Sequence, residues 1–355
     1  MSNTNKKIVS VGGQALIEGI MMQGPEGAAL SVRCPDGTID TEILEVKHIK
    51  DKFKPLGWPM IRGIVNYVES MIFGYKLLME SAEKTALDTE HEENESKLDK
   101  WINDHFGPKM MAVIGGISAV LGVALAFFLF MWLPSFVFDL VNNHLANGTL
   151  LSWRAVFEGA IRVVIFVVYM YAVSKMKEIH RVYMYHGAEH KTIFAFEHGK
   201  ELTVENIRSE KRCHPRCGTS FIFVIIIISV VISSAVSVIA PQLRDERIIW
   251  MAVKLLILPF VTGISYEFIK YAGKHDNLFV RICAAPGLWM QRLTTKEPDE
   301  NMIEVAISAF NASMTGVVPE KEPKEEIGGH SAVSPYPFSV ETSQVQFQQL
   351  LFLNQ

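Results

Sequence analysis

Four long apolar segments dominate the pattern of hydrophobic and polar positions along this chain of 355 residues. A helix needs about 20 apolar residues to cross the hydrocarbon core of a bilayer. All four segments reach that length, and the first contains no charged residue. The pattern therefore predicts an α-helical integral membrane protein with four transmembrane helices, at residues 110–138, 155–174, 220–240 and 248–273.

The basic residues between these segments predict the orientation of the chain. The connection at residues 175–219 contains nine Lys or Arg, whereas the short connections at 139–154 and 241–247 contain three between them. Basic loops stay in the cytoplasm, and the start of the chain has no apolar stretch typical of a secretory signal. We expect a multi-pass protein of the cell inner (plasma) membrane, with the bilayer as its partner and both termini cytoplasmic.

The remaining segments predict a small cytoplasmic α+β part. Residues 27–47 alternate apolar and polar positions around Pro35-Asp36-Gly37, which is typical of a β-hairpin. Residues 58–84 have apolar positions at helical spacing and lie on the membrane surface or pack on the cytoplasmic part. The expected organisation is an N-terminal cytoplasmic β-hairpin segment (1–57), an amphipathic helix with a charged linker (58–109), the four-span membrane domain (110–273), a C-terminal cytoplasmic segment (274–315) and a disordered tail (316–355).

A few charged residues interrupt the apolar segments. Glu158 and Arg162 are four residues apart, so we expect them to pair near the outer surface. Lys254 is expected to extend its ammonium outward to the membrane surface. Glu267 lies at the cytoplasmic end of the fourth segment, either as an ion-pair partner of Lys270 or as a functional carboxylate.

Composition and charge exclude some classes of function. The formal net charge of -4 leaves no basic surplus for phosphates, so we expect no nucleic-acid partner. The four cysteines, Cys34, Cys213, Cys217 and Cys283, are expected to remain reduced in the cytoplasm. They are better interpreted as metal ligands, nucleophiles or core residues than as disulfides.

One cytoplasmic stretch contains a candidate metal-binding pattern. His186, Glu189 and His190 form H-x-x-E-H, and residues four apart share a helix face, so both imidazoles can reach one ion. Glu189 is on nearly the same side and could serve as the general base for a water at the metal. This is the arrangement of inverzincin metallopeptidases. The alternative is a solvated polar loop.

Two neighbouring features supply further candidate ligands. Cys213, His214 and Cys217 precede the third apolar segment, and thiolate with imidazole suits a soft or borderline ion. Glu267, 77 residues after His190, has a separation that suits a distal third ligand. A straight helix from the second apolar segment would carry His186 roughly 15–20 Å beyond the membrane. A site shared with Glu267 or Cys217 therefore requires a bend between residues 174 and 186, and whether one site or two forms stays open.

Five motifs in order resemble the YqhQ-like family of bacterial membrane proteins: "GGQALIEGIMM", "HGAEHK", "HPRCGTSF", "APGLWMQRLTTKEPDE" and "IEVAI". That family is a domain of unknown function, described as predicted metal-dependent enzymes. The resemblance covers residues 8–310. It implies that the polar motif positions fall on Gln14, Glu18, His186, Glu189, His190, Lys191, His214, Arg216 and Cys217.

These observations favour a membrane-embedded, metal-dependent hydrolase with a cytoplasm-facing site. The expected ion is a divalent metal, zinc first, held by His186 and His190 with Glu267 or Cys217 as the third ligand, and Glu189 is the catalytic base. By analogy with H-x-x-E-H peptidases, the substrate is a peptide bond in a membrane protein. The alternative is a non-enzymatic scaffold, biogenesis factor or transporter whose His/Cys cluster binds metal structurally.

Overall fold

The computed structural model describes residues 11–46, 54–86, 108–214, 217, 218, 220–272, 275 and 277–319. These residues belong to two units, which we describe separately. The first contains the N-terminal and C-terminal parts of the chain with residues 170–225, and the second contains most of the apolar helices. The predicted charged linker at 88–100 and the predicted tail beyond residue 319 lie outside the described residues.

A four-stranded antiparallel sheet forms the centre of the first unit. Its strands follow chain order: β1 (Gly12–Leu16), β2 (Gly19–Gly24), β3 (Gly27–Arg33) and β4 (Ile39–Leu44). The predicted hairpin is confirmed as β3 and β4, whose register closes with Arg33 opposite Ile39. The sequence did not predict β1 and β2.

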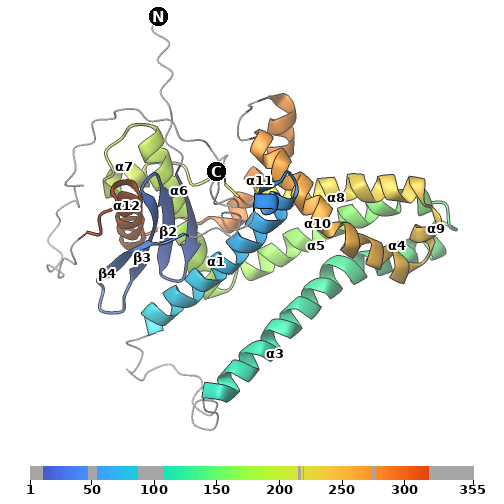
Figure 1. Cartoon of the computed structure of the whole chain (residues 1–355), viewed down its shortest axis with the longest axis horizontal. Helices are drawn as coiled ribbons and strands as arrows, with labels where there is room; N and C mark the ends of the chain where they lie inside the picture. The colour runs from blue at the N-terminus through green and yellow to red at the C-terminus, as the bar shows by residue number, and fades with distance from the viewer. Residues whose placement is uncertain are drawn as a thin grey trace, which may run out of the picture. The chain divides into compact units, whose positions relative to one another are not determined.

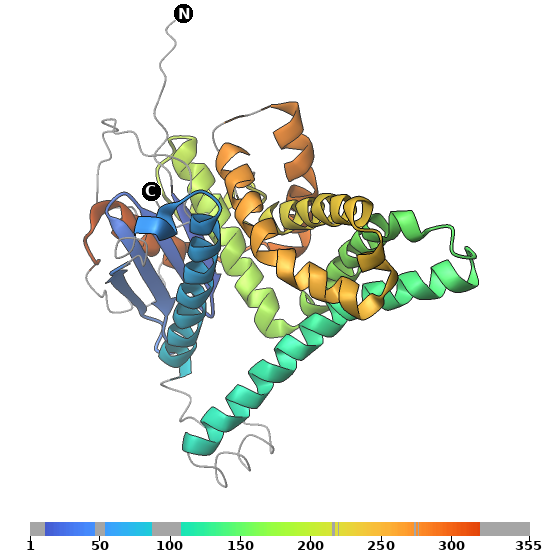
Figure 2. The same ribbon diagram turned by 45° about the vertical axis from the view of Figure 1, so that its right-hand side comes forward.

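Helices cover both faces of this sheet (Figures 1 and 2). Ile20 and Met22 of β2 pack in one core cluster with residues of α6 (Lys177–Glu197) and α12 (Glu300–Thr315). Leu30 and Val32 of β3 pack on the opposite face in a second cluster with Leu77 of α1 (Ile61–Ala86). Because the middle strands are buried on both faces, their sequences do not show the apolar–polar alternation of a half-exposed strand.

The described part of the first unit contains three further elements. They are η2 (Lys54–Gly57), α7 (Val204–Arg208) and α11 (Leu278–Thr294). The predicted helix at residues 58–84 is confirmed as α1, and its buried Leu77 shows that it packs on the sheet. Asp299 caps α12, since its side chain accepts a hydrogen bond from the Met302 amide, and Gly316 ends it with a left-handed φ of 68°.

The helix that leads into α6 is interrupted, as the sequence argument required. α5 (Arg154–Val173) ends three residues after Met170, and Met176 has an extended backbone with φ −69° and ψ 135° before α6 begins at Lys177. Ser174 Oγ donates to the Tyr171 carbonyl (2.7 Å), which satisfies a group at the helix end. This interruption precedes residue 177, within the region of residues 174–186 where the sequence argument required a bend.

Among the residues that the structure describes, four helical stretches are long and apolar enough to cross a membrane, at Gly116–His144, Leu151–Val173, Ile222–Ile239 and Arg247–Ala272. They confirm the four predicted apolar segments. The first is built from α3 (Pro108–Phe127), a π-helical turn η3 (Phe128–Trp132) and α4 (Leu133–His144), and the others are η4 (Leu151–Trp153) with α5, α8 (Ser220–Ile239) and α10 (Arg247–Ala272). A short helix, α9 (Gln242–Asp245), precedes α10.

The expectation for Lys254 was wrong. Its ammonium does not extend outward but is buried and bonded to the carboxylate of Glu158, 96 residues earlier in the chain. The physical reason is that a fully buried carboxylate needs compensating charge, and a lysine on a neighbouring helix supplies it. The predicted pair of Glu158 with Arg162 exists at 3.6 Å, but within this larger buried group.

Candidate metal centre

Helix α6 has one face that packs on the sheet and another that carries the candidate metal ligands. Tyr185 and Ala188 are buried in the cluster that packs on the sheet, which fixes the rotation of the helix. His186 and His190 are four residues apart and therefore project together from another face. Their imidazole rings lie 4.3 Å apart between centroids.

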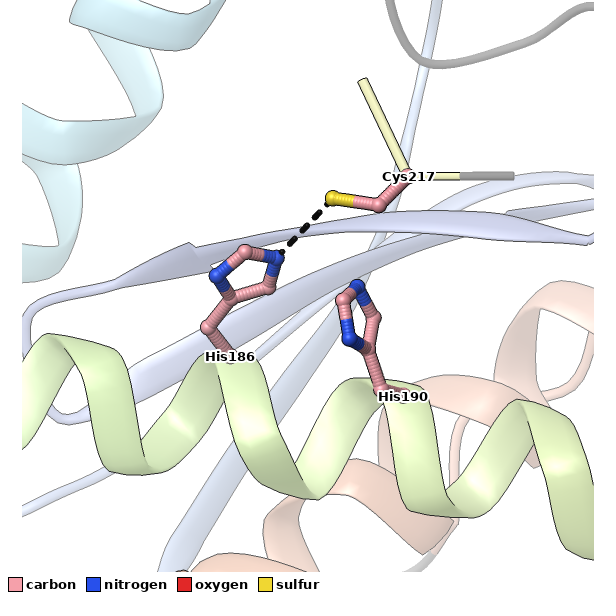
Figure 3. Close-up of side chains that lie close together, drawn as sticks. All are labelled: His186, His190 and Cys217. Atoms are coloured by element: carbon pink, nitrogen blue, oxygen red, sulfur yellow. Dashed lines mark hydrogen bonds between the residues drawn. The ribbon is translucent and has the colours of Figure 1, made fainter. Parts of the chain in front are cut away.

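Cys217 completes a group of three donors with these histidines (Figure 3). The ligand atoms of His186, His190 and Cys217 all lie within 4.8 Å of one another, and Cys217 Sγ lies 3.4 Å from His186 Nε2. A tetrahedral zinc ion with bonds of about 2.0 Å to nitrogen and 2.3 Å to sulfur separates such a pair of donors by roughly 3.5 Å. The donor types and their spacing therefore fit zinc.

Hydrogen bonds orient both imidazoles for this role. His186 Nδ1 lies 2.8 Å from the Thr294 carbonyl, and His190 Nδ1 lies 2.5 Å from the Arg212 carbonyl. A carbonyl only accepts, so each Nδ1 carries the proton, and Nε2 is the ring nitrogen that can bind a metal. Metal-binding histidines in proteins are held in the same way by backbone carbonyls.

The protonation state of His190 also favours metal binding. Burial lowers the pKa of its imidazole, and the neighbouring His186 lowers it further, although Cys217 and the Arg212 carbonyl act in the opposite direction. A lowered pKa keeps the ring neutral near pH 7, which is the form that binds a metal.

Close packing positions the Thr294 carbonyl against α6. The amide of Lys296 donates to the Tyr183 carbonyl (2.8 Å), so the segment after α11 runs directly beside the helix. A Cβ on Gly187 would lie 2.0 Å from the Lys296 carbonyl oxygen. Only glycine at position 187 permits this approach.

The Arg212 carbonyl belongs to a loop that is held at two further points. Lys191 Nζ, buried on α6, donates to the Arg208 carbonyl (2.9 Å) and pairs with Glu297 (2.7 Å). Gln291 Nε2, fully buried on α11, donates to the His214 carbonyl (2.8 Å). Lys191 therefore positions the loop that carries Cys217 and does not belong to the donor group.

Glu189 is buried between α6 and the sheet. It packs against Gly13 of β1, whose missing side chain leaves room for it, and the Gly13 backbone donates a hydrogen bond to its carboxylate. Burial raises the pKa of this carboxyl group, and the charges of His186 and His214 act in the opposite direction. Glu189 is thus close to the histidines in electrostatic terms, but it is not one of the three grouped donors.

Two further candidate ligands, Cys213 and His214, precede Cys217 in the chain. The His214 ring lies 5.8 Å from the His190 ring between centroids, and its Nε2 faces the Glu197 carboxylate at 3.4 Å. Burial lowers the pKa of His214 to about 4, so the ring is neutral. Neither His214 nor Cys213 joins the donor group in the part of the chain that the structure describes. Arg216 lies outside the described residues.

The structure gives Glu267 a different partner. Arg62 of α1 binds its carboxylate with two hydrogen bonds, at 2.7 Å from Nε and 2.5 Å from Nη2. Within the described residues Glu267 is therefore engaged by Arg62 and is not grouped with His186 and His190.

The two N-terminal motif residues connect elements of the first unit. Gln14 Nε2 of β1 donates to the Gly74 carbonyl of α1 at 3.5 Å. Glu18 lies in the turn between β1 and β2 with a positive φ of 48°, and its carboxylate accepts bonds from Arg181 and from the Tyr185 hydroxyl (3.1 Å). Both residues join β1 to a covering helix, and neither is a donor at the candidate metal site.

Sequence reasoning missed the groups that orient the site. The Thr294 and Arg212 carbonyls are backbone atoms, so their residue types carry no signal. Gly187 lies inside the "HGAEHK" motif, and a glycine in the middle of a helix costs about 1 kcal/mol relative to alanine. A glycine that is present despite this cost indicates a close packing contact at position 187, and this was the signal in the sequence.

Comparisons with known proteins identify the family of this chain. Residues 58–315 match the family described as "Protein of unknown function (DUF1385)". The chain is 33% identical over 303 residues to "Uncharacterized protein YqhQ" of Bacillus subtilis (strain 168), which covers 84% of this chain and 91% of that relative. No solved structure matches. The chain therefore belongs to the YqhQ-like family of proteins of unknown function.

Proposed function

We propose that this protein is a metal-dependent hydrolase of the bacterial plasma membrane, with its metal site on the cytoplasmic side and both termini in the cytoplasm. His186, His190 and Cys217 hold one divalent ion, zinc first. Three protein ligands leave one position of a tetrahedral ion open, which is the arrangement of catalytic rather than structural zinc. Zinc bound there would supply Lewis acidity and ease the deprotonation of water.

The observation that carries the proposal is the matched orientation of the two imidazoles. Each Nδ1 donates to a backbone carbonyl, at 2.8 Å for His186 and 2.5 Å for His190, and both rings point toward one thiol. Two imidazoles and one thiol whose ligand atoms lie within 4.8 Å of one another can share one ion. The arrangement therefore supports a metal centre.

Glu189 is the proposed general base. It follows His186 by three residues, and its carboxylate interacts electrostatically with the His186 and His214 side chains. It is not one of the three grouped donors, so the proposal gives it no role as a ligand. The proposed substrate class is a peptide bond in a membrane or membrane-proximal protein, by analogy with other enzymes that contain H-x-x-E-H.

A structural metal centre is the second candidate function, and one observation favours it. Cys217 belongs to the loop that also supplies the Arg212 carbonyl, whereas both histidines belong to α6. A metal bound by all three would connect this loop to the helix, as a closed structural site does. In that case the protein is a membrane scaffold, biogenesis factor or transporter with a stabilising ion.

Metal content tests both candidates in the purified full-length protein. We expect one zinc per chain by inductively coupled plasma mass spectrometry, and loss of that zinc in His186→Ala, His190→Ala and Cys217→Ser. His180→Ala is the matched control, because His180 is an exposed histidine on the same helix. Both candidates fail if the wild-type protein contains no stoichiometric metal after purification without chelator.

Glu189→Gln separates the enzyme from the structural centre. The zinc-loaded protein is incubated with a peptide library, and the products are identified by mass spectrometry. The hydrolase proposal expects cleavage by wild type and none by Glu189→Gln at full zinc content. Zinc removal that lowers the unfolding temperature without any cleavage by the loaded wild type supports the structural centre instead.

A further inference from the structure

The second unit contains a group of charged side chains buried among apolar helices, which we call the buried charge cluster. Its members come from three helices that include candidate membrane spans: α4, α5 and α10. Ionisable residues inside such spans are costly and mark functional sites more often than other buried residues. The cluster consists of Asp139, Arg154, Glu158, Arg162, Arg247 and Lys254.

Glu158 is the centre of the cluster and is fully buried. Its carboxylate accepts bonds from Ser135 Oγ (2.9 Å), Arg154 Nε (3.0 Å), Trp250 Nε1 (3.3 Å) and Lys254 Nζ. A carboxylate has about four lone-pair sites. Glu158 therefore has no acceptor capacity left for a further cation.

The cations of the cluster outnumber its carboxylates. Four basic side chains share the negative charges of Asp139 and Glu158, and Asp139 already engages both Arg154 (3.1 Å) and Arg247 (2.6 Å). Buried charges are stable only when they are paired. By formal charge the described members of the cluster have a surplus of two positive charges, and Arg247 and Asp139 are its most exposed members.

Arg162 is the cation with the weakest compensation. Its Nε donates to the Phe130 carbonyl (2.9 Å) in the π-helical turn, but its Nη2 lies 3.6 Å from the saturated Glu158 carboxylate. That Nη2 is buried without a hydrogen-bond acceptor among the described residues. A guanidinium with unused donors in an apolar setting is a binding group for an anion.

The surroundings add to the positive potential. Arg247 is the first residue of α10, and the helical stretch that contains Arg154 begins three residues earlier, at Leu151, so two helix N-termini with their partial positive charge lie at this end of the spans. Arg162 follows eight residues after Arg154, which places it about 12 Å along the helix at 1.5 Å per residue. The cluster thus extends inward from the helix ends.

We propose that the buried charge cluster binds a phosphate group, either from a lipid headgroup or from a free anion. A phosphate monoester carries up to two negative charges, which matches the surplus, whereas one carboxylate would neutralise only half of it. Guanidinium groups bind phosphate oxygens with paired hydrogen bonds. Arg162 is the residue that gains most, because the ligand supplies acceptors for its unused donors.

The test compares full-length wild type with Arg162→Gln and with Arg208→Gln, in which a largely exposed arginine outside the cluster is changed. Delipidated protein in neutral detergent is incubated with phosphatidic acid, or with diacylglycerol of the same chains as the phosphate-free match, and adducts are counted by native mass spectrometry. A parallel titration with inorganic phosphate follows the unfolding temperature. We expect Arg162→Gln to weaken phosphate-dependent binding by roughly tenfold to a hundredfold, and Arg208→Gln to leave it unchanged.

The outcomes are distinct. Retention of phosphatidic acid without a response to inorganic phosphate assigns the site to lipid, and the reverse assigns it to a free anion. In the absence of phosphate, Arg162→Gln should be at least as stable as wild type, since it removes an uncompensated charge. The proposal is overturned if wild type shows no phosphate-dependent binding, if Arg162→Gln binds phosphate like wild type, or if Arg162→Gln unfolds more readily than wild type in phosphate-free buffer. Arg162→Lys keeps the charge and should bind with intermediate affinity.

Discussion

Gly187→Ala should damage the metal centre although alanine is the better helix former. The added Cβ would lie 2.0 Å from the Lys296 carbonyl oxygen, whereas carbon and oxygen in contact lie about 3.3 Å apart. The segment after α11 must therefore retreat by roughly 1.3 Å. Backbone on one side and helix on the other leave no flexible side chain to absorb that movement.

The expected magnitude is a balance of two effects. Alanine in place of glycine gains about 1 kcal/mol in a helix interior. Overpacking costs typically about 1–3 kcal/mol and more when backbone must move. The retreat also stretches the bond from Lys296 N to the Tyr183 carbonyl and the bond from His186 Nδ1 to the Thr294 carbonyl, both 2.8 Å. We expect a net loss of about 2 kcal/mol in the free energy of unfolding, since the clash involves backbone.

Two measurements check this prediction. For a unit of this size, a loss of about 2 kcal/mol lowers the unfolding temperature by roughly 4–8 °C. Loss of a hydrogen bond that orients a metal-binding histidine lowers metal affinity roughly tenfold to a hundredfold, measured by competition with a chromophoric zinc chelator. Gly122→Ala in α3 is the matched control, because a Cβ there meets nothing within 4 Å. Wild-type stability and zinc affinity in Gly187→Ala would refute the reasoning.

Three further predictions test the assignment of individual residues. Glu267→Gln should leave the zinc content of the purified protein unchanged, because the Glu267 carboxylate is bound by Arg62. Loss of zinc in this variant would show that Glu267 is a metal ligand. Lys191→Met should lower stability by about 1–3 kcal/mol and weaken zinc binding by releasing the loop at Arg208, and thermal unfolding with chelator competition measures both. Burial alone would raise the pKa of Glu18, but its bonds with Arg181 and Tyr185 bring the pKa below its ordinary value. A carboxyl group whose pKa is lowered by folding stabilises the folded state at pH values above its unfolded pKa of about 4.3. Glu18→Gln should therefore lower the free energy of unfolding by about 1 kcal/mol at pH 7, a value discounted because Arg181 is half exposed. Denaturant titrations should show the difference in stability between wild type and variant shrinking as the pH falls below 4.

The parts of the fold that the sequence predicted are those that depend on local pattern. The spans follow from uninterrupted apolar length, and the β3–β4 hairpin follows from a Pro-Asp-Gly turn in which Gly37 has a φ of 83°. The pairing of His186 with His190 follows from four-residue spacing on a helix. In each case the signal lies within one element or between adjacent ones.

The missed strands had no such signal. All six residues of β2 are buried, because helices cover both faces of the sheet. Alternation of apolar and polar positions arises only when one face meets water. The glycines of β1 and β2 permit close approach of other elements: a Cβ on Gly13 would meet Glu189, and a Cβ on Gly24 would meet the Ser313 carbonyl of α12.

The same limit explains the choice of ionic partners. Local spacing predicted an ion pair between Glu267 and Lys270, and an ammonium of Lys254 at the membrane surface. The structure brings Arg62, 205 residues away in sequence, to Glu267, on which Lys270 also acts electrostatically, and it brings Lys254 to Glu158. A buried or half-buried charge is stabilised by whichever opposite charge the fold places within hydrogen-bond distance, and that choice depends on helix packing. The Cys217 thiol follows the same rule, since buried Lys191 and Gln291 bind the Arg208 and His214 carbonyls that precede it, and its Sγ lies 3.4 Å from His186 Nε2. A sequence can therefore nominate the donors of this centre, but their selection from His186, His190, Cys213, His214, Cys217 and Glu267 is a property of the tertiary fold.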